Sequence, residues 1–242
     1  MTAEILDATR RMDHRDLMVF LDYDGTLTQI MPKPSLATPD GDLKSLLAEF
    51  SGKFTTVIVT GRTLEDIRDF LGDAYSCIAL HGSLYYHDGS IEDLSGRIQE
   101  YSRITSTIFG SCKFLEKRFP GMVMYDKHGG VLFHHIAMNP ALIPDLQQEI
   151  QGLAREYGMS FYRGKNVMEV RIPGIDKGTA IRKVRNGHPA MIAGDDATDE
   201  EAFVANPEAI TIHVGNNESS ARYSIPDYRA MRNLMRLMID DI

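Results

Sequence analysis

Hydrophobic and polar positions alternate along the first third of the chain in a way that predicts strands and helices in turn. Short apolar runs typical of buried strands are interleaved with stretches whose apolar residues recur three and four apart: strands at 17–21, 54–59 and 77–80, and helices at 43–50 and 64–71. Strands that alternate with helices form right-handed βαβ units on a parallel sheet. Residues 17–82 therefore predict a parallel α/β sheet.

The middle of the chain, residues 84–171, follows another pattern. Two long apolar faces with helical spacing run from Ile98 to Phe119 and from Leu142 to Tyr157. Short apolar segments on either side of polar, glycine-containing turns predict hairpins at 84–91, 122–137 and 159–172. We expect a small α+β domain with an antiparallel sheet covered by two helices.

The last stretch returns to α/β spacing, with helices and strands again in turn: a helix at 177–184, strands at 190–193 and 210–214, and a helix from Asp227. The predicted fold is a doubly wound parallel α/β sheet interrupted by an α+β insertion. The expected domain bounds are 1–83 with 174–242 for the core, and 84–173 for the insertion.

Composition narrows the function classes. The 242 residues carry 26 Lys and Arg against 34 Asp and Glu, a net charge of −8, and no basic block, which argues against nucleic-acid binding. The first residues lack the apolar run of a signal peptide and no stretch is long enough to span a membrane, so we expect a cytoplasmic protein without membrane contact. We also expect a monomer. Cys77 and Cys112 form no CxxC pair; the sequence leaves a disulfide open, but two buried thiols fit better.

Two acidic clusters follow predicted strands. Asp22 and Asp24 follow the strand at 17–21, and Asp195, Asp196 and Asp199 follow the strand at 190–193. Ligands bind beyond the carboxyl ends of strands in open α/β sheets, where both clusters would meet. A hard cation such as Mg²⁺ would offset their repulsion. Turn formation alone also explains an Asp-Tyr-Asp-Gly run, but not the second cluster.

Two further sites carry groups suited to an anion. Thr60, Gly61 and Arg62 end the strand at 54–59, where a hydroxyl, backbone N–H groups and a helix start could bind a phosphoryl group. The alternative interpretation makes Thr60 a helix N-cap. Lys177 opens a predicted helix and would supply a cation for the phosphoryl group and the crowded carboxylates.

In this order the motifs resemble those of the haloacid dehalogenase-like phosphatases, and more closely those of the trehalose-6-phosphate phosphatases. The strings that carry the resemblance are FLDYDGTL (20–27), TGR (60–62), KNVMEVRIPGIDKGTA (165–180) and GDDATDEEAF (194–203). The resemblance covers nearly the whole chain. It implies that the insertion is the cap domain that selects the substrate.

The resemblance also implies roles for the core residues. Asp22 is the expected nucleophile, which forms an aspartyl-phosphate, and Asp24 the expected acid and base. Thr60 and Lys177 would bind the phosphoryl oxygens. Mg²⁺ would be held by Asp22, by the carbonyl of Asp24 and by Asp195, with Asp196 and Asp199 orienting metal-bound water or the lysine.

In the insertion, Lys127, Lys165 and Glu169 match positions that the family uses on the sugar, and His81 of the core matches a residue that faces the cleft. An exposed ion pair is the alternative interpretation of Lys165 with Glu169. The chain departs from the family where His134-His135-Ile136 replaces an HYR string and where Tyr125 replaces a glutamate. These changes bear on the choice of sugar and not on phosphatase chemistry.

The expected function is a Mg²⁺-dependent phosphatase acting on a small phosphorylated sugar, first of all trehalose 6-phosphate. The alternatives are a phosphatase of another phosphorylated sugar or glycoside, and a phosphosugar-binding regulator without turnover. A metal-dependent glycosyltransferase would leave Lys177 and the second acidic cluster unexplained. A phosphomutase would need to protect its aspartyl-phosphate from water.

Overall fold

The computed structural model describes residues 1–31, 33–164 and 166–242. The chain divides into two compact units, one formed by Met1–Glu92 with Asp176–Ile242 and the other by Asp93–Ile175. The second unit is thus inserted in the sequence of the first, and we call the two units the core and the cap.

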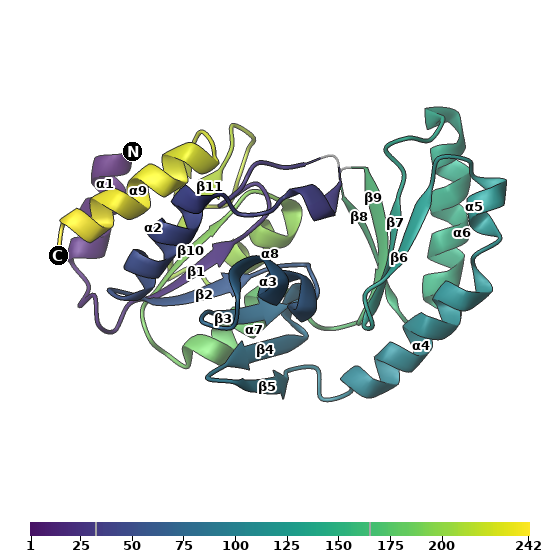
Figure 1. Cartoon of the computed structure of the whole chain (residues 1–242), viewed down its shortest axis with the longest axis horizontal. Coiled ribbons are helices and arrows are strands. Elements are labelled where there is room, and N and C mark those ends of the chain that lie inside the picture. Colours follow the sequence, from purple (N-terminus) through teal and green to yellow (C-terminus); the bar gives the residue numbers. More distant parts are fainter. Residues whose placement is uncertain (32, 165) are drawn as a thin grey trace. The chain divides into compact units, whose positions relative to one another are not determined.

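The core is built on an eight-stranded sheet (Figure 1). From one edge to the other its strands are β12 (Tyr223–Ile225), β11 (Ile210–Val214), β10 (Ala190–Gly194), β1 (Met18–Asp22), β2 (Thr55–Val59), β3 (Ser76–Ala79), β4 (Leu84–His87) and β5 (Ser90–Asp93). The strands from β12 to β3 pair in parallel, and β4 is antiparallel to β3. This confirms the predicted α/β class.

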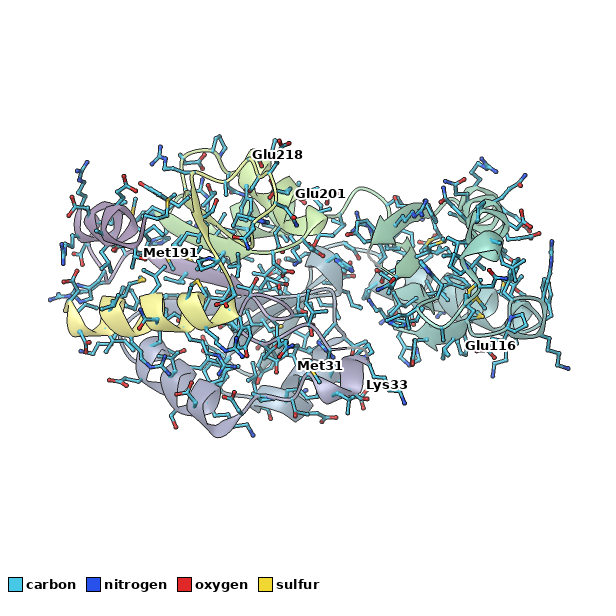
Figure 2. All side chains as sticks on the ribbon, turned by 90° about the horizontal axis from the view of Figure 1, so that it is seen from above. Met31, Lys33, Glu116, Met191, Glu201 and Glu218 are labelled. Atoms are coloured by element: carbon cyan, nitrogen blue, oxygen red, sulfur yellow. The ribbon has the colours of Figure 1, made fainter. Side chains whose placement is uncertain are left out.

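Helices cover both faces of this sheet: α1 (Thr2–Arg10), α2 (Gly41–Ser51), α3 (Leu64–Leu71), α7 (Lys177–Arg185), α8 (Ala197–Ala205) and α9 (Tyr228–Asp240). Val19 and Leu21 of β1 pack with residues of α2, α3 and α9, and Met191 of β10 is fully buried in the same cluster (Figure 2). Phe20, which lies between Val19 and Leu21, points to the opposite face because side chains alternate along a strand. The helices α7 and α8 pack on each other there. Burial on both faces explains why the central strands read as continuous apolar runs.

The cap has its own antiparallel sheet, and its strands are, in order, β6 (Val123–Asp126), β7 (Gly130–His134), β9 (Val167–Arg171) and β8 (Ser160–Gly164). Its helices are α4 (Ile98–Ser111), α5 (Leu115–Arg118) and α6 (Ile143–Glu156). One face of the sheet packs against the helices through fully buried side chains such as Val131, Phe133 and Met168, which meet Ile108 and Ile150. The other face is free of these helices (Figure 1).

The sequence predicts one helix over 98–119, but the structure breaks it into α4 and α5. The break follows Ser111, one residue after Gly110, whose low helix propensity weakens the last turn of α4. Cys112, Leu115 and Phe119 remain buried on both sides of the break. The apolar spacing therefore marks the buried face correctly while missing the turn within it.

The hairpin at 84–93 belongs to a different sheet from the one expected. We expected it in the insertion, but β4 pairs with β3 of the core through Cys77 with Tyr86 and Ala79 with Leu84. The compact units accordingly divide after Glu92 and after Ile175, where the sequence suggested 83 and 173. A local turn pattern predicts a hairpin. Which sheet the hairpin joins depends on which sheet has an edge strand with unpaired backbone N–H and C=O groups.

Both cysteines are free and buried, as the composition favoured. They lie in separate apolar clusters, Cys77 in the core and Cys112 in the cap. Burial raises the pKa of the Cys77 thiol to about 12, so this thiol stays protonated. Among the residues that the structure describes, no helix combines the length and the apolar character that crossing a membrane requires.

Candidate active site

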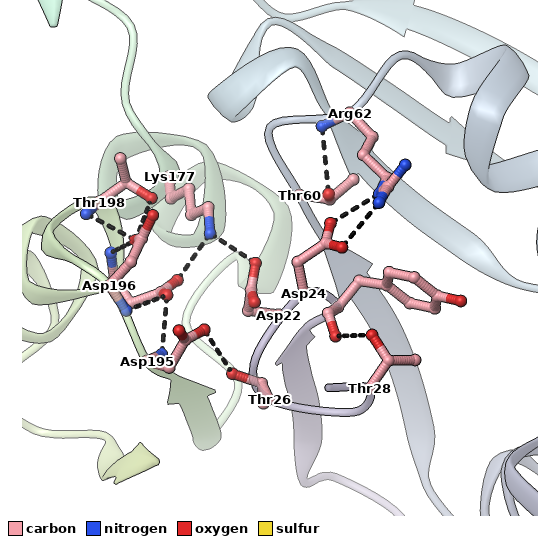
Figure 3. A network of polar contacts seen from close by, with 12 residues as sticks. Asp22, Asp24, Thr26, Thr28, Thr60, Arg62, Lys177, Asp195, Asp196 and Thr198 are labelled. Atoms are coloured by element: carbon pink, nitrogen blue, oxygen red, sulfur yellow. Dashed lines mark hydrogen bonds and ion pairs between the residues drawn. The ribbon is translucent and has the colours of Figure 1, made fainter. Parts of the chain in front are cut away.

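The predicted motifs converge at the carboxyl edge of the core sheet (Figure 3). β1 lies between β10 and β2, with Leu21 in register with Ala193 and Asp22 in register with Val59. The residues that follow these three strands therefore meet. This places the loops with Asp22, Thr60 and Asp195 side by side, as parallel strands require.

Lys177 lies at the centre of the first group of contacts. Its Nζ donates to Asp22 Oδ1 and to Asp199 Oδ1, each at 2.7 Å, and the lysine is 2% exposed. The lysine is the first residue of α7, and Asp176 caps that helix by accepting from the backbone N–H of Thr179 at 2.8 Å. The cap fixes where the helix begins, so Lys177 enters the site from a rigid element.

Asp199 also organises the loop before it. Its Oδ2 accepts the backbone N–H of Asp195 at 3.0 Å and that of Asp196 at 3.2 Å. A Cβ on Gly194 would lie 2.1 Å from Asp199 Cγ, so only glycine fits at the end of β10. Asp196 caps α8 by accepting from Thr198. Asp196 thus has a structural role that the acidic pattern alone does not reveal.

Carboxylates outnumber cations in this group. Ligand oxygens of Asp22, Asp195 and Asp199 lie within 4.8 Å of one another, and Lys177 contacts two of the three carboxylates, those of Asp22 and Asp199. Burial raises the pKa of Asp22 and of Asp199 well above the usual value, against the effect of Lys177. Burial, with the charges of Asp199 and Asp196, raises the pKa of Asp195 to about 7. These hard oxygen donors suit Mg²⁺, which would relieve the excess negative charge.

Two groups of the site, Lys177 and Asp196, keep their charged forms in spite of burial. Burial works against the charged form of Lys177, but the carboxylates of Asp199 and Asp22 hold its pKa well above the usual value. Burial likewise opposes ionisation of Asp196, yet Lys177 and the hydroxyl of Thr198 lower the pKa of that carboxyl to about 2. Both groups are therefore charged near neutral pH.

Asp24 lies apart from the three-carboxylate group. Its two oxygens accept from Arg62, at 2.6 Å from Nε and 2.7 Å from a terminal nitrogen (Figure 3). Arg62 was expected to bind the substrate, and in the structure its guanidinium contacts the second aspartate of the first motif instead. This pair could not be predicted from the pattern of residues, because Asp24 and Arg62 lie on different loops 38 positions apart.

Thr60 and Gly61 lie in the turn that follows β2. The Thr60 hydroxyl accepts the backbone N–H of Arg62 at 3.1 Å, and the helix that follows is capped by Thr63 and not by Thr60. A Cβ on Gly61 would lie 2.2 Å from Cε1 of His81. The small glycine therefore lets the histidine ring lie against the turn.

His81 is held in an unusual backbone conformation. Leu80 and His81 have φ angles of 50° and 55°, and Gly82 follows at 113°. The backbone N–H of His81 donates to the carbonyl of Thr60 at 3.1 Å. Two consecutive non-glycine residues with positive φ cost free energy, and such strain collects at functional sites.

The cap residues expected at the sugar lie on the face of the sheet away from the helices. Lys127 Nζ donates to Glu169 Oε1 at 2.9 Å, and this carboxylate is 3% exposed. Glu169 is in register with Leu132 on one side and Tyr162 on the other, and Tyr125 follows next to Leu132. Lys165 falls outside the described residues. The cap thus presents tyrosines beside a buried carboxylate.

Two contributing residues were missed by the sequence analysis. Thr26 donates to Asp195 Oδ1 at 3.3 Å, and Arg232 of α9 donates to the carbonyl of Leu27 at 2.8 Å and to Asp40. Thr26 lies within the string FLDYDGTL, but the sequence analysis gave this threonine no role. No local pattern in the sequence pointed to Arg232, because Leu27, whose carbonyl it contacts, lies about 200 positions away.

The chain matches known proteins over most of its length. A family model described as trehalose-phosphatase matches residues 20–232. The trehalose-6-phosphate phosphatase-related protein of Thermoplasma acidophilum is 40% identical over 91% of this chain and 96% of its own. The bifunctional trehalose-6-phosphate synthase/phosphatase of Thermoproteus tenax is 30% identical over 90% of this chain, which spans 31% of that protein.

A solved structure shares the fold over nearly its full length. The crystal structure of a trehalose-6-phosphate phosphatase related protein superposes with a TM-score of 0.88 at 39% identity, covering 92% of this chain and 97% of the other. The agreement extends over both the core and the inserted cap.

Proposed function

Since the chain belongs to the trehalose-phosphatase family and is thereby a phosphoric monoester hydrolase, we propose that it hydrolyses trehalose 6-phosphate to trehalose and phosphate with Mg²⁺. The observation that carries the proposal is the group formed by Asp22, Lys177 and Asp199 at the carboxyl edge of the sheet. It combines a carboxylate suited to act as nucleophile with a buried cation, in a chain that matches this family over residues 20–232.

The proposed reaction has two steps. An oxygen of Asp22 attacks phosphorus, and the bond between phosphorus and the sugar oxygen breaks while Asp24 gives that oxygen a proton. Asp24 then takes a proton from a water molecule that attacks the aspartyl-phosphate, which releases phosphate and restores Asp22. Lys177, with the hydroxyl of Thr60 and the backbone of Gly61, would hold the phosphoryl oxygens.

Mg²⁺ would be held by Asp22, by the backbone carbonyl of Asp24 and by Asp195, with Asp196 and Asp199 behind them. When bound, the metal offsets the repulsion between an anionic nucleophile and an anionic phosphate. Asp199 already binds Lys177 and two backbone N–H groups, so its role is to hold the lysine and the loop. Burial and the acidic neighbours raise the pKa of Asp195 to about 7, which means that its charged form lacks compensation that a bound cation would supply.

In the cap, Lys127, Glu169 and Lys165 would bind sugar hydroxyls, and His81 would contribute from the core. A disaccharide offers many hydroxyls, so its site needs fixed donors and acceptors. Glu169 is well placed to accept, because Lys127 holds its carboxylate in one orientation. Tyr125, which is 44% exposed in the same row, adds an aromatic surface of the kind that packs on sugar rings.

The test is phosphate release from a panel of phosphorylated sugars by the wild type and by Asp22→Asn. The panel contains trehalose, glucose and sucrose 6-phosphates and a mannosyl phosphoglycerate, each with and without Mg²⁺. Turnover that requires Mg²⁺, disappears in Asp22→Asn and favours trehalose 6-phosphate supports the proposal. Asp69→Asn, an exposed aspartate on α3, is the matched control and should behave like the wild type.

The other outcomes separate the alternatives. Turnover that favours another sugar would keep the chemistry and assign the cap a different specificity. No turnover on the whole panel, with ligand-induced thermal stabilisation still present, would indicate a phosphosugar-binding regulator. Gel filtration of the same preparations tests the expected monomer.

A further inference from the structure

Arg62 contacts the proposed acid and base with both arms of its guanidinium group. Nε donates to Asp24 Oδ2 at 2.6 Å, and a terminal nitrogen donates to Asp24 Oδ1 at 2.7 Å. Two parallel hydrogen bonds fix both the position and the plane of a carboxylate, which a single bond or a point charge does not do. The pair therefore sets the direction in which Asp24 faces.

The guanidinium group is itself held in place. The terminal nitrogen that contacts Asp24 also donates to the backbone carbonyl of Pro34 at 2.8 Å. The guanidinium carbon lies 4.9 Å from the ring centre of Phe70 and 5.7 Å from that of Tyr23, and the arginine is 9% exposed. Three of its roughly five N–H donors are used within the protein. A guanidinium so enclosed is built to hold a neighbour rather than to receive a phosphate.

The backbone of Arg62 is fastened as well. Its N–H donates to the Thr60 hydroxyl at 3.1 Å, and its carbonyl accepts the N–H of Leu80 at 2.9 Å. The arginine thus joins the turn after β2 to the loop after β1. Both loops carry residues of the proposed reaction.

We propose that Arg62 is a positioning residue that acts on the reaction through Asp24, by holding its carboxylate oriented, and not by contact with the phosphoryl group. This inference rests on the proposed phosphatase function. Loss of the guanidinium would let the Asp24 side chain adopt other rotamers, so the proton transfers that Asp24 performs would slow. Binding of the substrate would change little.

A double-mutant cycle tests the inference with the intact chain, using Asp24→Asn, Arg62→Met and the double variant on trehalose 6-phosphate or the sugar phosphate that the panel favours. Arg62→Met should lower kcat about 10–100-fold and change KM less than about threefold. The double variant should turn over within about twofold of Asp24→Asn, because the arginine has nothing left to position. Arg62→Lys, which keeps the charge but not the fork, should recover only part of kcat.

A substrate with an activated leaving group gives a second measurement. p-Nitrophenolate leaves without a proton. The rate of the first turnover of p-nitrophenyl phosphate by Arg62→Met, measured in a rapid-mixing experiment, should therefore stay within about threefold of the wild-type rate. Arg68→Lys is the control, since Arg68 lies on α3 and forms an exposed ion pair with Asp73. It should not change the turnover of either substrate. Melting temperatures show whether each variant is folded.

Three results would overturn the inference: a rise in KM with kcat retained, losses that multiply in the double variant, or a loss in the first turnover of p-nitrophenyl phosphate, relative to the wild type, as large as the loss on the sugar phosphate. Each would mean that Arg62 acts on the phosphoryl group directly. A wild type that hydrolyses no phosphate ester would refute the proposed function, and the inference with it. That failure is seen without any Arg62 variant, so the two are distinguishable.

Discussion

Each unit of the molecule pairs a lysine with a buried carboxylate, but the surrounding charge differs. In the core, Lys177 contacts Asp22 and Asp199, and Asp195 belongs to the same group. In the cap, Lys127 contacts Glu169, and Arg171 lies two residues further along the same strand, on the same face.

The difference indicates what each place is suited to bind. Carboxylates outnumber cations in the core group, which leaves negative charge for a metal ion to offset. Around Glu169 in the cap, the described residues include two cationic side chains, Lys127 and Arg171, and the register also brings tyrosines alongside. Such a face offers donors and aromatic surface to a polyol.

The largest expected effect comes from replacing each lysine with methionine, which removes the charge and keeps a long side chain. Lys177→Met should lower kcat about 10²–10³-fold on trehalose 6-phosphate and on p-nitrophenyl phosphate alike, since both present a phosphoryl group. Lys127→Met should raise KM for the sugar phosphate about tenfold and leave p-nitrophenyl phosphate unchanged. Equal losses on both substrates from Lys127→Met would remove the distinction between the two lysines.

The second prediction concerns pH and the metal. Because the pKa of Asp195 is raised to about 7 in the folded chain, the metal-free protein gains stability from that proton at low pH and loses this gain as pH rises through 7. Mg²⁺ competes with the same proton, so its affinity should weaken about tenfold for each pH unit below 7. Calorimetric titration with MgCl₂ at pH 5.5, 6.5 and 7.5 measures this, and equal affinities at the three values would contradict it.

The third prediction is that two similar substitutions change stability in opposite directions. At pH 8 without metal, Asp195→Asn removes one of several repelling charges and should raise the free energy of unfolding by about 1–2 kcal/mol. Glu169→Gln leaves Lys127 without its charged partner and should lower it by about 1–3 kcal/mol. Each kcal/mol corresponds to a shift of roughly 2–4 °C in Tm for a chain of this size. Shifts of the same sign would contradict the difference in charge balance.

The smallest effect is expected at an exposed pair. Arg97 and Glu100 form an ion pair at the start of α4, with more than half of each side chain exposed to solvent at 58% and 51%. Glu100→Gln should leave the free energy of unfolding unchanged within the error of the measurement, because water screens the charges. If Glu100→Gln lowered the free energy of unfolding as much as Glu169→Gln in the same denaturation series, burial would not explain the difference between the Arg97–Glu100 and Lys127–Glu169 pairs.

Periodicity along the chain was enough to predict the two kinds of sheet. The central strands are continuously apolar because helices cover both of their faces, and the cap helices show their buried face at three- and four-residue steps. Position in the chain also predicted that Asp22 and Asp195 would meet, since parallel strands bring their carboxyl ends to one edge. The place of Lys177 beside them was expected from the order of the motifs and from the resemblance to the family. These features depend on local pattern or on a general rule of sheet topology.

What the sequence did not reveal depends on contacts between distant residues. The hairpin at 84–93 has the same local signal in either sheet, and only the free edge of β3 decides where it pairs. The partner of Arg62 lies 38 residues away on another loop. Thr60 and Thr63 are both good capping residues, and the choice of Thr63 follows from where α3 begins.

The hairpin of β4 and β5 occupies the edge of the core sheet beside β3. β3, with Cys77, Ile78 and Ala79 buried, would be an open edge without it, and an open apolar edge invites a strand from another copy. β5 takes that position with an exposed strand that carries Glu92, which pairs with Lys183. If the cap were removed by design and the first segment of the core ended at Ser83, the edge of β3 would be exposed and the protein should aggregate. If that segment instead continued to Glu92, the sheet would keep a charged edge strand and should stay soluble.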